Sequence, residues 1–197
     1  MVSAVKMLFL TFLRVSSLSG LRWEEIDYKK RVKNGPDALG FDYYYGHCGS
    51  LDMAPYVYVE DGVVTAAPNR ITVNDDYKGF WRVGPTGSAF YHIDVTPNFV
   101  RRSVDYIEER AKTGKPFFLY LPLPSPHTPI LSIDEFEGKS GTNEYGDFVR
   151  QVDWHMGQIM EALERSEVAE NTLFIFTADN GCSPRAQFEE LDEVGHK

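Results

Sequence analysis

The sequence predicts an α/β fold with a mixed, mostly parallel sheet that is flanked by helices. Two observations support this fold class. A helical pattern over residues 96–111 precedes an apolar run at 117–121, and a second helical pattern over 145–165 precedes an apolar run at 173–177. Alternating helices and buried strands are typical of parallel sheets that helices cover on both faces. The content of 43% hydrophobic and 25% charged residues is ordinary for a globular domain.

Each helix carries sequence signals at its ends or along one face. In the first helix Thr96 is the expected N-cap, Pro97 stands at the first helical position, and Gly114 ends the helix. Apolar residues recur in it at helical spacing: Val100, Val104, Ile107 and Ala111. In the second helix one face carries Phe148, Val152, His155 or Met156, Ile159 and Leu163. Residues 117–121 and 173–177 are unbroken apolar runs, which predicts two strands buried on both faces.

The first half of the chain is less regular. Glycine and proline punctuate residues 21–55 and 69–91, which we therefore interpret as loops. Between them the pair Asp61-Gly62 separates two β-rich runs at 56–60 and 63–65. This pattern predicts a hairpin with a two-residue turn.

We expect residues 20–197 to form one domain and residues 1–19 to be a separate segment. Lys6 precedes an apolar run at 7–13, and Arg14 ends that run. The run is too short to span a membrane as a helix. Three interpretations remain open: an export signal without a convincing cleavage site, a buried strand, or a segment foreign to the fold.

The net charge of −9 argues against nucleic-acid binding, because an acidic surface repels phosphate backbones. The same charge permits a divalent cation site. The two cysteines, Cys48 and Cys182, can form neither a disulfide framework nor a four-thiolate zinc site.

Polar residues that could bind a ligand or take part in catalysis follow the two predicted strands. In parallel sheets, ligands bind at these carboxyl ends of the strands. Asp179 and Asn180 precede Gly181 and offer hard oxygen ligands for calcium or magnesium. An Asx turn that closes the strand is the structural alternative. After the other strand, four prolines hold His127 in residues 122–129, where an imidazole can bind an anion or donate a proton. A structural histidine is the alternative there.

Taken together, these two loops closely resemble the arylsulfatase family of the alkaline-phosphatase-like superfamily. The resemblance rests on KPFFLYLPLPSPHTP at 115–129 and TADNGCSPR at 177–185. NGPDALGFDY at 34–43 and SLDMAPYVY at 50–58 also look like segments of bacterial members. The resemblance covers roughly residues 20–196.

The resemblance implies an alkaline-phosphatase-like fold and a sulfuric ester hydrolase acting on aryl or carbohydrate sulfates. It makes Asp179 and Asn180 ligands of one calcium ion and makes His127 a catalytic residue that contacts the sulfate. The partner would be a sulfated small molecule or polysaccharide. Family members are commonly exported, which implies a periplasmic or secreted protein.

Several parts of the family pattern are missing from the sequence. The family's formylglycine arises from the cysteine of Cys-x-Pro-Ser-Arg, whereas Cys182-Ser-Pro-Arg lacks the serine before arginine, and Cys48 lies in no such motif. The pair Asp75-Asp76 lies in a predicted loop, and Lys197 is not taken as the family's later sulfate-binding lysine. We therefore interpret the chain as an internal fragment of a catalytic domain, incomplete as a fold, inactive by itself and poorly stable.

Two other functions stay open. A phosphate or phosphonate ester hydrolase of the same superfamily would share the metal loop, and a non-catalytic relative could bind sulfated glycans without turnover. Among the other histidines, His155 is expected to be structural and His92 has no evident partner. His47 could line a substrate cleft with the tyrosines at 43–45.

Overall fold

The computed structural model describes residues 5–8, 27–32, 35–47, 49–74, 80–182 and 184–195. The chain divides into two compact units. The sheet unit comprises residues 1–92 and 115–124, and the helical unit comprises residues 93–114 and 125–197.

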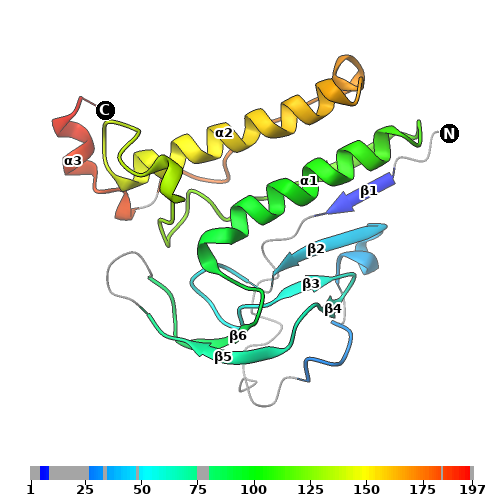
Figure 1. Cartoon of the computed structure of the whole chain (residues 1–197), viewed down its shortest axis with the longest axis horizontal. Coiled ribbons are helices and arrows are strands. Elements are labelled where there is room, and N and C mark those ends of the chain that lie inside the picture. The colour runs from blue at the N-terminus through cyan, green and yellow to red at the C-terminus, as the bar shows by residue number, and fades with distance from the viewer. Residues whose placement is uncertain are drawn as a thin grey trace. The chain divides into compact units, whose positions relative to one another are not determined.

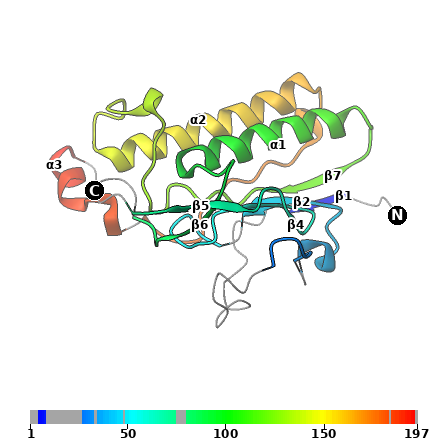
Figure 2. The ribbon, with the colours of Figure 1, turned by 60° about the horizontal axis from the view of Figure 1, so that its bottom comes forward.

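The sheet unit contains a mixed five-stranded sheet with the strand order β4-β3-β2-β1-β7. Its strands are β1 (Val5–Leu8), β2 (Tyr43–His47), β3 (Tyr58–Glu60), β4 (Val63–Val64) and β7 (Phe117–Tyr120). β1 pairs in parallel with both β2 and β7, and Figure 2 shows β7 beside β1. β3 is antiparallel to β2 and to β4. The mixed sheet confirms the predicted α/β class.

β1 lies within the segment that the sequence sets apart from the domain. Its register pairs Met7 with Tyr43 on one side and with Leu119 on the other. A strand is one of the three interpretations of this segment, and residues 9–20 lie outside the described part of the chain. The boundary at residue 20 stays a prediction.

The predicted hairpin is confirmed. Asp61 and Gly62 form the turn between β3 and β4 with φ angles of 45° and 78°, as a type I′ turn requires. The Asp61 carboxylate accepts the backbone N–H of Tyr44 at 2.9 Å, and the Asp61 N–H donates to the Tyr44 carbonyl at 2.8 Å. The turn residue therefore also fixes the hairpin to β2.

The loop interpretation of residues 21–55 and 69–91 was wrong for three strands. β2 is a mostly buried strand, and β5 (Pro68–Thr72) pairs antiparallel with β6 (Gly84–Gly87). Figure 1 shows β5 and β6 as adjacent strands. A Cβ at Gly87 would lie 2.9 Å from the Ala66 carbonyl oxygen, so glycine permits a close backbone approach here. The glycines and prolines that suggested loops are thus compatible with paired strands.

The expectation of strands buried on both faces was also wrong. β7 alternates between half-buried and exposed residues, and the Phe118 side chain is 49% exposed. Residues 173–177 form no strand, and Leu173 and Ile175 are 85% and 73% exposed. These apolar runs remain in contact with solvent because no further layer covers them within the described residues.

The helical unit is built on α1 (Val95–Ala111) and α2 (Glu144–Arg165), which pack side by side in Figures 1 and 2. The predicted apolar face of α2 is confirmed by five buried residues: Phe148, Val152, His155, Ile159 and Leu163. α1 begins before Thr96, so Thr96 is not the N-cap, and its hydroxyl donates to Ser125 Oγ at 3.1 Å. No helix among the described residues has the length and apolar character needed to cross a membrane.

Short helices complete the described secondary structure. α3 spans Phe188–Glu193. The 3₁₀ turns are η3 (Pro36–Leu39), η4 (His92–Asp94), η5 (Asp134–Phe136), η6 (Ala169–Asn171) and η7 (Pro184–Ala186).

Candidate functional site

His127 is exposed in the loop that connects β7 to η5. Its Nδ1 lies 2.6 Å from the Thr128 carbonyl oxygen, so Nδ1–H is the donor of this hydrogen bond. The other ring nitrogen, Nε2, is then the atom that can meet a ligand. To donate to an anion through Nε2, the ring must be the imidazolium form, which carries a proton on both nitrogens.

Buried neighbours hold the His127 loop in place. Thr128, Leu131 and Ser132 are each less than 9% exposed. The loop therefore presents an exposed imidazole on a segment whose following residues are packed into the unit.

Asp179 and Asn180 lie in an exposed bend after residues 172–178, which form neither helix nor strand. Their carboxylate and amide oxygens suit calcium, which takes six to eight oxygen ligands. Within the described residues, no group of three or more His, Cys, Asp or Glu side chains could hold a metal ion. Asp179 and Asn180 therefore offer the oxygen atoms that calcium prefers, but two side chains are fewer than a calcium site needs.

The remaining motif residues do not add to this site. Cys182 is a free and exposed thiol. Cys48, Asp75-Asp76 and Lys197, none of which is a predicted site residue, lie outside the described residues.

His47 and His92 belong to a buried aromatic cluster in the sheet unit. His47 is 1% exposed, and burial, with a smaller effect of His92, lowers its pKa to about 3. The His92 ring stacks on Trp81 at 4.2 Å and meets Tyr56 edge-on at 4.4 Å. The suggestion that His47 lines a substrate cleft was wrong, because the side chain is buried and its ring stays neutral near pH 7.

A polar network on the buried face of α2 was not recognised as a network from the sequence. Gln151 and His155 are both buried, and Gln151 Nε2 lies 3.1 Å from His155 Nε2. Burial lowers the pKa of His155, and its hydrogen bond to Gln158 partly offsets this. The structural role expected of His155 is confirmed. Gln151 and His155, spaced i, i+4 beside apolar residues on one face, were the signal for a network.

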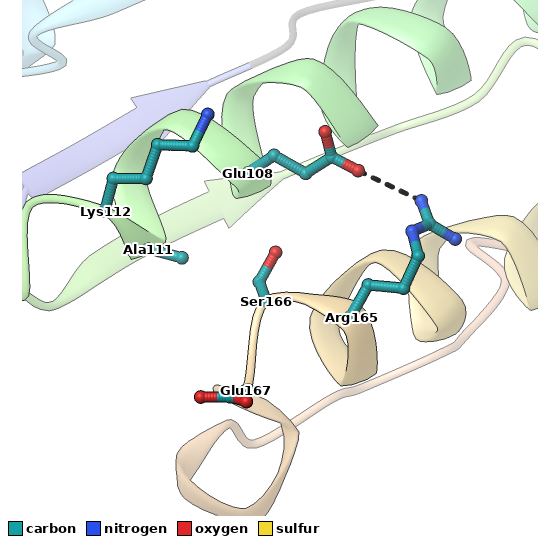
Figure 3. A pocket seen from close by; sticks show the side chains of 6 residues that line it. All are labelled: Glu108, Ala111, Lys112, Arg165, Ser166 and Glu167. Carbon is teal, nitrogen blue, oxygen red and sulfur yellow. Dashed lines mark hydrogen bonds and ion pairs between the residues drawn. The ribbon is translucent and has the colours of Figure 1, made fainter.

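An open pocket lies between the C-terminal ends of α1 and α2, with a volume of about 450 Å³. Figure 3 shows its lining residues, Glu108, Ala111, Lys112, Arg165, Ser166 and Glu167. Glu108 and Arg165 form an ion pair of 3.0 Å across it. The charges of its two basic and two acidic side chains cancel, and none of the predicted site residues lines the pocket.

Comparisons with known proteins identify the family. A sulfatase family model matches residues 25–194. An N-acetylgalactosamine-6-O-sulfatase of Bacteroides thetaiotaomicron is 32% identical over 187 residues, covering 79% of this chain and 37% of the relative. The human N-acetylgalactosamine-6-sulfatase is 37% identical over 151 residues, covering 73% of this chain and 26% of the relative.

Solved structures agree with the sequence matches. A Bacteroides thetaiotaomicron structure, solved in work on the metabolism of multiple glycosaminoglycans, superimposes with a TM-score of 0.75 and 25% identity. The superposition covers 98% of this chain and 47% of that one. This chain thus spans less than half the length of the relatives that it matches. From the family match and the level of identity, we conclude that the chain belongs to the sulfatase family.

Proposed function

We propose that this chain forms part of the catalytic domain of a sulfatase that acts on a sulfated carbohydrate, of which N-acetylgalactosamine 6-sulfate is the model. The observation that carries the proposal is the family match over residues 25–194, together with relatives named for this sulfated sugar. The protein would meet such a substrate in the periplasm or outside the cell.

His127 is the proposed sulfate contact. Its exposed ring projects from a well-packed loop, and Nδ1 is already engaged by the Thr128 carbonyl. A sulfate oxygen would accept a hydrogen bond from Nε2–H of the imidazolium, which also offsets the negative charge.

Asp179 and Asn180 are the proposed calcium ligands. When bound, calcium would supply positive charge that stabilises the sulfate oxygens. Because the described residues supply so few ligands, we expect weak binding, with a dissociation constant on the order of 10⁻³ M. The role of the two side chains is to supply oxygen atoms that orient the ion.

We do not expect this chain to hydrolyse sulfate esters by itself. The 197 residues contain no Cys-x-Pro-Ser-Arg motif, so the formylglycine nucleophile of the family has no precursor here. The same observation favours the second candidate, a relative that binds sulfated glycans without turnover.

The proposal is tested by calorimetric titration of the chain with N-acetylgalactosamine 6-sulfate in the presence of calcium. Unsulfated N-acetylgalactosamine is the control ligand, and His127→Ala is the test variant. We expect the sulfated sugar to bind and the variant to lose at least tenfold in affinity, because a charge-assisted hydrogen bond disappears. Equal affinity of the wild type and His127→Ala would refute the role of His127, and release of sulfate by the wild type would refute the expected lack of turnover.

A further inference from the structure

The loop that carries His127 is fastened to both helices of the helical unit by side-chain hydrogen bonds. Before His127, Ser125 Oγ accepts the hydroxyl of Thr96 from α1 at 3.1 Å. After His127, the backbone N–H of Ile133 donates to Gln151 Oε1 of α2 at 2.9 Å. The intervening residues are largely buried, so movement at either end would be transmitted to the imidazole.

The attachment to α2 continues into a buried chain of hydrogen bonds. Gln151 is completely buried, and its oxygen is used by the Ile133 N–H, so its amide nitrogen donates to His155 Nε2 at 3.1 Å. His155 Nε2 is therefore an acceptor, and its proton lies on Nδ1, which is 2.9 Å from Gln158 Oε1. One tautomer and one amide orientation satisfy all three contacts.

This order of donors and acceptors removes the freedom of the Gln151 side chain. If the amide rotated by 180°, its nitrogen would face the Ile133 N–H, and its oxygen would face the unprotonated His155 Nε2. Two donors would then oppose each other at one end and two acceptors at the other. His155 thus holds the Gln151 oxygen in the position that the loop requires.

We propose that Gln151 and His155 are positioning residues that fix the His127 loop for contact with the sulfate group. The inference rests on the proposed function of His127. Neither residue touches the ligand: Gln151 acts through Ile133, and His155 acts through Gln151.

The test compares three variants in the whole chain by amide hydrogen exchange and by the NMR signals of the His127 ring. Gln151→Met keeps the side-chain length but removes both hydrogen bonds. Gln151→Glu keeps an acceptor for the Ile133 N–H, and a proton shared between its second carboxyl oxygen and His155 Nε2 takes the place of the amide donor. Val152→Ala is the matched control, because Val152 is also buried on α2 but makes no side-chain hydrogen bond.

We expect Gln151→Met to accelerate exchange of the Ile133 amide roughly tenfold and to shift the His127 signals, because the Ile133 N–H loses its acceptor. Gln151→Glu should restore slow exchange and the wild-type His127 signals. Val152→Ala should lower overall stability while it leaves the relative protection of Ile133 and the His127 signals unchanged.

The inference is overturned if Gln151→Met and Val152→Ala have the same effect on Ile133 and His127, or if Gln151→Glu exchanges as fast as Gln151→Met. Should Gln151→Met fail to fold, the comparison of Gln151→Glu with the wild type decides. Titration with inorganic sulfate separates the two proposals. Unchanged sulfate affinity in His127→Ala contradicts the proposed function, whereas the exchange data test the positioning residues independently.

Discussion

Asp147 offers the sharpest test of how the helical unit is held together. It lies in the first turn of α2 and is 5% exposed. Its Oδ2 accepts the backbone N–H of Gly138 and its Oδ1 accepts that of Ser140, both at 2.7 Å. One carboxylate therefore fixes the loop before α2 to the helix itself.

The change Asp147→Asn keeps one acceptor oxygen and places an NH₂ group against the second backbone N–H. A hydrogen bond to a charged group contributes about 1.5–3 kcal/mol, and an unsatisfied buried donor adds a cost of its own. Loss of the charge near the helix N-terminus contributes a further 0.3–1 kcal/mol or so. We expect Asp147→Asn to lower the free energy of unfolding by about 2–4 kcal/mol.

Urea unfolding at pH 7 measures this difference, with Glu144→Gln as the control. Glu144 occupies the same first turn but is exposed, so its loss should cost no more than about 1 kcal/mol. If Asp147→Asn costs no more than Glu144→Gln, the two hydrogen bonds of the Asp147 carboxylate do not stabilise the fold.

The pH dependence provides a second check on Asp147. Burial alone would raise the pKa of this carboxyl group, but hydrogen bonds from Ser140, Gly138 and Lys139 outweigh burial and lower it below 3.8. A lowered folded-state pKa means that the stabilisation is present above the unfolded pKa and is lost as the pH falls through the folded one. The stability difference between the wild type and Asp147→Asn should therefore shrink below about pH 4.

Two further predictions concern the sheet unit and the exposed apolar run. Because the folded pKa of His47 is about 3 and the ordinary value is 6.5, the unfolded chain alone takes up this proton between those pH values. The free energy of unfolding should then fall with decreasing pH by up to about 1.4 kcal/mol per pH unit. Urea unfolding at a series of pH values should show a weaker pH dependence for His47→Gln. An equal pH dependence in both proteins would contradict the lowered pKa of His47. Ile175 is 73% exposed within an apolar run, so we expect the chain to self-associate through this run. Light scattering should then show less self-association for Ile175→Lys, whose stability should change by no more than about 0.5 kcal/mol. Unchanged association would show that this run is not the contact.

The elements predicted correctly are those with strong local signals. The periodic apolar face of α2 identifies that helix, and the pair Asp61-Gly62 identifies the hairpin turn. β6 has the sequence Gly-Pro-Thr-Gly, which suggests a loop, and it becomes a strand through pairing with β5. Long-range pairing of this kind leaves no local pattern, so the sequence could not reveal it.

The candidate site was predictable as a set of motifs but not as an arrangement. The loops with His127 and with Asp179 were identified by their residues, and the structure places both on the surface of the helical unit. The run at 173–177 shows why burial was misjudged: its composition fits an interior strand, but burial needs a neighbour that composition cannot supply. The Gln151–His155 contact likewise depends on Ile133, which belongs to a different segment.

We propose above that Asp179 and Asn180 bind calcium beside the sulfate contact of His127. The most direct measurement is the calorimetric affinity for N-acetylgalactosamine 6-sulfate with and without calcium, in the wild type, in Asp179→Ala, and in Asp192→Ala as an exposed control carboxylate. We expect calcium to strengthen binding in the wild type and in Asp192→Ala, and we expect this gain to disappear in Asp179→Ala. An equal effect of calcium on all three proteins, or none in the wild type, would contradict the proposal.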